Sequence, residues 1–191
     1  MSLKESIEKM VNLNGRVHES AKVVLRDIKK FKDLLKSLNN SKNGKAFDKI
    51  KNDAQKALEQ VRQDLIKEQD DADAWEAQVK TAKTDLAKAK KDLKENREGY
   101  EFNLKKCQDL NKILKKYNET PQGKKKPEYL LPEIDPAVAM KDATRAVEDA
   151  ELDIDFNEAS LGVVQAQTKS DKKTLERRVS ELFEKKFKSA K

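Results

Sequence analysis

The chain has 191 residues, of which 40% are charged, 36% hydrophobic and 5% aromatic, and its formal net charge is +7. This composition supplies apolar side chains for seams between helices but too few for a thick, multilayered core. Four prolines and five glycines are too few for a disordered chain. We therefore expect an elongated, folded, all-α protein.

No apolar run is long enough to cross a bilayer, so the chain is expected to contact a membrane only at its surface. The single cysteine, Cys107, cannot form an internal disulfide. Together with the lack of a signal peptide at the N-terminus, this predicts a cytoplasmic protein that is peripheral to membranes.

The first expected helix covers residues 3–39. Its apolar residues are spaced three and four apart from Leu3 to Leu38, as in helices that pack side by side, and a turn follows at residues 39–44. Residues 2–13 allow two interpretations because Asn14 and Gly15 follow them: a separate membrane-inserting helix, or the first turns of one continuous helix. The apolar residues keep the same helical spacing before and after Asn14 and Gly15, which favours the continuous helix.

Two longer helices are expected at residues 45–117 and 136–188. The first contains no proline, and its apolar stripe runs from Phe47 to Tyr117. The second begins with Asp135 as a candidate N-cap and Pro136 in the first turn.

Residues 118–135 contain three prolines and three consecutive lysines and are expected to form the loop between these two helices. Chain reversals make the helices antiparallel neighbours. Two residues that face each other should then have numbers that add up to about 84 in the first pair of helices, and to about 252 in the second pair. This register predicts one domain, residues 1–191, with a three-helix end and a two-helix arm that carries the loop at its tip.

Charge supports the predicted arm. Residues 133–158 have a balance of −7 and residues 80–117 one of +6, and antiparallel packing sets these two segments side by side. Unbalanced positive charge remains in residues 22–51 and 172–191, at the three-helix end, and in the loop. The candidate membrane-binding residues are Lys22, Arg26, Lys29, Lys30, Lys45, Lys49, Lys51, Lys124, Lys125 and Lys126.

This arrangement resembles the BAR domain superfamily in its short first helix, long second helix, basic central region and lysine-bearing tip. The resemblance covers residues 3–188 and depends on architecture and charge layout. It implies a crescent-shaped homodimer that binds, senses or shapes curved anionic membranes through lysines and arginines on one face. Two three-helix ends would join at a two-fold axis. The expected dimer core consists of Val61, Leu65, Trp75, Leu175 and Leu182.

Other functions compete for the same residues. The main alternative is a coiled-coil scaffold or cytoskeletal adaptor that binds a protein partner without lipid, since lysine- and glutamate-rich helices often only solvate a coiled coil. Interleaved acidic residues and the lack of a recognition helix or stacking platform disfavour nucleic acid. Tyr129, Leu130 and Leu131 could insert at a lipid interface, but packing over the end of the arm is favoured.

Catalysis has little support in the sequence. His18 is the only histidine and cannot build a metal site with Cys107. No Ser-His-Asp set and no glycine-rich phosphate loop can be identified. We therefore expect no enzymatic activity, no cofactor and no metal.

Overall fold

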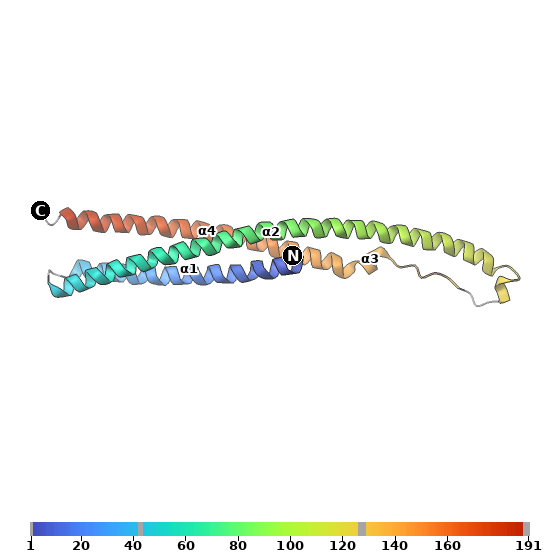
Figure 1. Cartoon of the computed structure of the whole chain (residues 1–191), viewed down its shortest axis with the longest axis horizontal. Coiled ribbons are helices and arrows are strands. Elements are labelled where there is room, and N and C mark those ends of the chain that lie inside the picture. Colours follow the sequence, from blue (N-terminus) through green and yellow to red (C-terminus); the bar gives the residue numbers. More distant parts are fainter. Residues whose placement is uncertain (1, 42–43, 126–128, 189–191) are drawn as a thin grey trace. The chain divides into compact units, whose positions relative to one another are not determined.

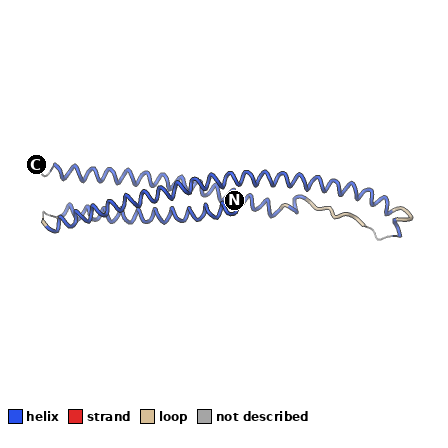
Figure 2. The backbone as a smooth tube through the Cα atoms, viewed as in Figure 1, coloured by secondary structure: helices blue, strands red, loops and turns tan. Residues whose placement is uncertain are grey.

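The computed structural model describes residues 2–41, 44–125 and 129–188, and side chains up to residue 179 in the last helix. It contains the helices α1 (Leu3–Asn40), α2 (Lys45–Asn118), α3 (Pro136–Ala139) and α4 (Lys141–Lys188), and a short 3-10 helix, η1, at Gly123–Lys125 (Figure 1). The described residues include no strand, and loops join the helices (Figure 2). The predicted all-α class is confirmed, with three long antiparallel helices of 38, 74 and 48 residues.

The chain divides into two compact units. The three-helix unit consists of Lys4–Ala82 and Ile154–Lys191, and therefore contains α1, the first half of α2 and most of α4. The loop unit consists of Lys83–Asp153, together with the first three residues of the chain. It contains the second half of α2, the loop, α3 and the start of α4.

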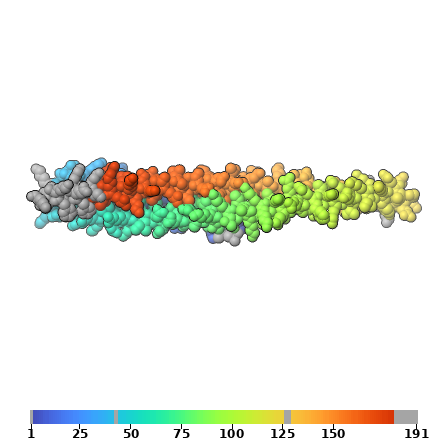
Figure 3. Space-filling view, turned by 90° about the horizontal axis from the view of Figure 1, so that it is seen from above, coloured from blue at the N-terminus to red at the C-terminus, as the bar shows by residue number. Residues whose placement is uncertain are grey.

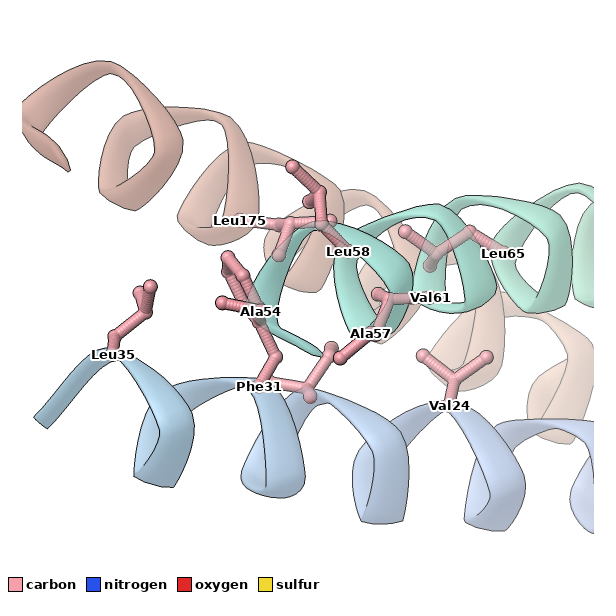
Figure 4. Close-up of a cluster of buried hydrophobic side chains, with 10 residues drawn as sticks. Val24, Phe31, Leu35, Ala54, Ala57, Leu58, Val61, Leu65 and Leu175 are labelled. Atoms are coloured by element: carbon pink, nitrogen blue, oxygen red, sulfur yellow. The ribbon is translucent and has the colours of Figure 1, made fainter. Parts of the chain in front are cut away.

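The three-helix unit is held together by the predicted apolar stripes. Phe31 of α1 points toward Ala54 and Ala57 of α2, and Leu175 of α4 lies beside Leu58 (Figure 4). Burial of a side chain as large as phenylalanine stabilises a fold by about 1.5–3 kcal/mol. Figure 3 shows α4, in orange, packed along α2, in teal, within this unit.

The pairing of α1 with α2 has the predicted register. Gln78 Nε2 donates a hydrogen bond to the Ser6 carbonyl oxygen at 3.1 Å. Arg16 donates to Asp71 at 2.7 Å. Both pairs have residue numbers that sum to about 84, the value that a short turn between antiparallel helices predicts.

Residues 2–13 do not form a separate helix. α1 runs without interruption through Asn14 and Gly15, and Ser6 and Met10 are fully buried in its first turns. Asn14 Nδ2 donates to Asn157 Oδ1 at 3.0 Å, so the residue that breaks the apolar stripe pairs with an amide of α4. The prediction of one continuous helix is confirmed.

A buried carboxylate joins α2 to α4 in the same unit. Glu68 is almost fully buried, and the Thr168 hydroxyl donates a hydrogen bond to its Oε1 at 2.8 Å. Burial raises the pKa of Glu68 because the charged form loses its water, although the threonine hydrogen bond acts in the opposite direction. A polar contact of this kind fixes which turns of two helices face each other, because a shifted register would leave the carboxylate unpaired.

In the loop unit, the expected register of α4 on α2 is wrong. A sum of about 252 places residue 90 beside residue 162, but Lys90 Nζ lies 2.6 Å from Glu151 Oε1. The difference is already present in the extended residues 129–135, which we call the return segment, because the numbers of the contacting residues Asn111 and Leu131 sum to 242. Asn111 of α2 contacts both Leu131 and Glu133 of this segment. From the Asn111–Leu131 contact to the Lys90–Glu151 pair the sum changes only to 241, so the shift from 252 arises before Leu131, where the chain reverses.

The third predicted helix is also divided. Asp135 and Pro136 start it as expected, and the Asp135 side chain accepts a hydrogen bond from the Ala137 N–H. The helical geometry ends after one turn at Met140, whose φ of −107° and ψ of 5° lie outside the α region. The long helix α4 then begins at Lys141. Met140 is buried, so the interruption places an apolar side chain against α2.

Candidate functional site

Three of the predicted membrane-binding residues lie together on α1. Arg26, Lys29 and Lys30 line a shallow surface groove with Asp33. This grouping follows from helix geometry, because residues three and four apart share one side of a helix. The positive charge of Arg26 is partly balanced, since its guanidinium donates to both carboxylate oxygens of Asp27 at 3.0 and 3.4 Å. That hydrogen bond lowers the pKa of Asp27.

The other predicted lysines lie on α1, on the first turns of α2 and in the loop. Lys22 is exposed but does not line the α1 groove, and neither do Lys45, Lys49 and Lys51, which are exposed on α2. Lys124 and Lys125 are exposed on η1. Lys126 lies outside the described residues.

The η1 turn that carries the loop lysines is closely packed. The Thr120 hydroxyl donates to the Tyr117 carbonyl at 2.6 Å and accepts from the Gly123 N–H at 3.1 Å. A Cβ atom on Gly123 would lie within 2.1 Å of the Tyr117 carbonyl oxygen, so only glycine fits there. Local backbone contacts therefore hold Lys124 and Lys125 in place.

Some cations of α2 form ion pairs that the predicted membrane-binding lysines lack. In the middle of α2, Lys80, Lys91, Lys94 and Arg97 each lie within 4.0 Å of a glutamate one turn away. In contrast, no carboxylate of a described residue lies within that distance of eight predicted membrane-binding lysines. These eight are Lys22, Lys29, Lys30, Lys45, Lys49, Lys51, Lys124 and Lys125. All eight side chains are exposed, although the pKa of Asp27 is lowered by the Arg26 hydrogen bond and also by the nearby charge of Lys30.

Four of the five predicted dimer-core residues are buried within the single chain. Val61 and Trp75 are completely buried, and Leu65 and Leu175 nearly so. Trp75 packs against the His18 ring at a centroid distance of 6.3 Å, and its Nε1 has no hydrogen-bond partner among the described residues. The side chain of Leu182 lies outside the described residues. The dimer itself stays a prediction.

Two of these residues nevertheless line an open groove between α2 and α4. The groove has a volume of about 560 Å³, and Leu65 and Leu175 form part of its apolar floor. Ile66, at its edge, is 63% exposed. Charges of both signs surround the groove: Arg62, Asp70, Lys172 and Glu176. This is a surface that a second apolar helix could cover.

An apolar row on the second half of α2 was not predicted. Tyr117 was assigned to the core stripe, but the structure leaves it 42% exposed, and Phe102, Leu110 and Ile113 are more exposed still. The less exposed residues of this part of α2 are Leu104, Cys107, Asn111 and Leu114, and Asn111 binds the return segment. The signal for this row is a second apolar series with steps of eight, three and four residues, which lies one or two residues before the less exposed positions.

The two residues considered for a metal site belong to different units. His18 contacts Trp75, and Cys107 is a half-buried free thiol in the other unit. Among the described residues, no three His, Cys, Asp or Glu side chains are grouped so that they could hold a metal ion.

None of the described helices has a stretch long and apolar enough to traverse a bilayer. Comparison with protein-family models, with curated protein sequences and with solved structures finds no match to the chain. No family is therefore assigned, and any function must be argued from the residues themselves.

Proposed function

We propose that the protein binds anionic membrane surfaces as a homodimer and senses or shapes their curvature, without catalysing a reaction. The observation that carries this proposal is the set of eight exposed lysines that have no carboxylate of a described residue within 4.0 Å. Surface lysines on helices can form pairs with acids one turn away, as Lys80, Lys91 and Lys94 do in α2. Lysines that are left unpaired in groups can instead attract an anionic leaflet, at about 1 kcal/mol for each charge near the surface.

Homodimerisation through the groove between α2 and α4 is the second part of the proposal. Leu65, Leu175 and the exposed Ile66 offer apolar surface there, and a second copy can cover it. Because Arg62 and Lys172 border the same groove as Asp70 and Glu176, two copies related by a two-fold axis can pair opposite charges at its rim.

The test is co-sedimentation of the purified protein with vesicles that contain phosphatidylserine, over a range of diameters and salt concentrations. Binding should require the anionic lipid, weaken as salt rises and vary with diameter. Vesicles of phosphatidylcholine alone serve as the control. No binding to anionic vesicles of any diameter at low salt would reject the membrane function in favour of a scaffold that binds a protein partner.

A further inference from the structure

The second half of α2 carries a row of exposed apolar side chains. Phe102 is 57% exposed, Leu110 49%, Ile113 64% and Tyr117 42%. With 3.6 residues per turn, their positions place them along one side of the helix, over a length of about 22 Å. We call this set the α2 row.

No other described element of its unit covers the α2 row, whose side chains are 42–64% exposed. The return segment lies on another side of the helix, because it is bound by Asn111, which follows Leu110 by one residue and points about 100° away. Single exposed apolar residues are common, but a row of four on one helix side is the pattern of a helix that meets an apolar phase.

Lysines accompany the α2 row along its length. Residues 105–125 contain seven lysines against Asp109 and Glu119. Lys112 pairs with Asp109 at 3.0 Å, while the others have no carboxylate of a described residue within 4 Å. Lys106 lies within the row, with its Nζ 4.4 Å from the centre of the Phe102 ring. Its charge thus lies over an aromatic side chain at the same surface.

We propose that the α2 row inserts into the boundary between headgroups and acyl chains of an anionic bilayer, while Lys105, Lys106 and Lys116 contact the phosphates. An amphipathic helix in this position buries its apolar side about 5–10 Å deep, and lysines beside that side reach back to the headgroups. Tyrosine suits the same depth, because its ring is apolar and its hydroxyl polar. The inference rests on the proposed membrane function and adds an apolar component to it.

Charge favours lipid over other occupants of the α2 row. A second copy of the chain in the same place would set one excess of lysines against another, which is unfavourable. An acidic protein helix would satisfy the charge, and the experiment below separates it from lipid.

The test uses the full-length chain with one added tryptophan. Ile113→Trp places the probe in the α2 row, and Gln108→Trp places it on the same helix, exposed, but about 200° around from the row centre. Each variant is mixed with phosphatidylserine vesicles that carry brominated acyl chains, which quench tryptophan only at short range. We expect quenching and a blue shift for Ile113→Trp, and neither for Gln108→Trp. The buried Trp75 contributes the same background to both.

A second pair of variants measures the contribution of the α2 row to binding. Leu110→Ser with Ile113→Ser should lower the affinity for anionic vesicles by about tenfold or more, and Gln108→Ser should leave it unchanged. Equal quenching of the two probes, or equal affinity of the serine variants, would overturn the insertion while salt-sensitive binding of the original chain still stood. If the original chain binds no vesicles, the proposed function fails and the insertion fails with it.

Discussion

The Asn111 side chain of α2 both donates a hydrogen bond to the backbone of Leu131 and accepts one from it. Its Nδ2 donates to the Leu131 carbonyl oxygen at 3.0 Å, and its Oδ1 accepts from the Leu131 N–H at 2.8 Å. The same Nδ2 also lies 2.9 Å from Glu133 Oε1. An extended segment has no internal hydrogen bonds, so one amide side chain supplies the partners that a helix or strand would give to this backbone.

We predict that Asn111→Ala loosens the return segment. The change leaves the Leu131 amide and carbonyl groups without their partner, at a cost of about 1–3 kcal/mol for each buried polar group. Hydrogen exchange at the Leu131 amide should become faster, and proteases should cut within residues 118–135 more readily. Asn103→Ala, at an exposed position of the same helix, is the control and should change neither rate. Unchanged exchange at Leu131 in the Asn111 variant would contradict this role.

The position of Asn111 shows why the helix register could not be predicted. Heptad spacing correctly located the three long helices, because it records which residues face a neighbour. The register of the returning chain depends instead on how the chain reverses between residues 118 and 131. Pro132 and Pro136 disfavour a helix before Asp135, but the amide contact that binds the segment to α2 joins residues 20 positions apart and leaves no local pattern.

Glu68 provides a prediction about pH. Its folded pKa is raised by burial, so the protonated form is favoured in the folded chain. The resulting stabilisation is fully present below the ordinary glutamate pKa near 4.5 and is lost as the pH rises through the folded value. Glu68→Gln removes the buried charge and keeps an acceptor for Thr168. It should therefore raise the melting temperature at pH 7, and the gain should disappear below about pH 4.

Glu76 is the matched control, because its pKa is shifted in the opposite direction to that of Glu68. Hydrogen bonds from Lys80 and Gln165 lower its pKa, so its stabilisation is present at neutral pH and is lost as the pH falls through the folded value. Glu76→Gln should therefore lower the melting temperature at pH 7 and have no effect in acid. The two variants are compared by thermal melts monitored by circular dichroism between pH 3 and pH 8. If Glu68→Gln instead lowers the melting temperature at pH 7, the prediction is wrong, and the folded chain stabilises the Glu68 charge despite its burial.

Ile66 tests the proposed dimer surface. The variant Ile66→Glu places a charge at the edge of the groove between α2 and α4, where the side chain is already exposed, so the folded single chain should tolerate it. Its mass in solution should fall to that of one chain, because an unpaired charge in an apolar interface costs several kcal/mol. Phe156→Glu, at another exposed apolar position of the same unit, should leave the mass unchanged. Dimers of undiminished stability in the Ile66 variant would place the interface elsewhere.

The residues of a dimer core are harder to predict from sequence than the helices, because burial within one chain and burial between two chains produce the same apolar pattern. The apolar stripe identifies residues that are covered, but it does not tell whether the cover comes from the same chain or from a second copy. Val61 and Trp75 are already covered by α1 and α4, whereas the exposed Ile66 lies one position after the stripe residue Leu65. The surface lysines were simpler to predict, since a charge that lies off the apolar stripe is exposed whatever the register.

The last prediction concerns the unpaired lysines. Exchanging Lys29, Lys30, Lys45 and Lys49 for glutamine removes four charges, and at about 1 kcal/mol each this should lower the affinity for phosphatidylserine vesicles by a hundredfold or more. Exchanging Lys124 and Lys125 should produce a smaller loss. The control is Lys91→Gln with Lys94→Gln, because both of these lysines have glutamate partners at 3.6 and 4.0 Å. Their removal should change the affinity by much less than the removal of Lys124 and Lys125, although the number of charges lost is the same. Equal losses for these two pairs would show that vesicle binding depends on total charge, and would remove the support that the unpaired lysines give to a specific membrane-binding surface.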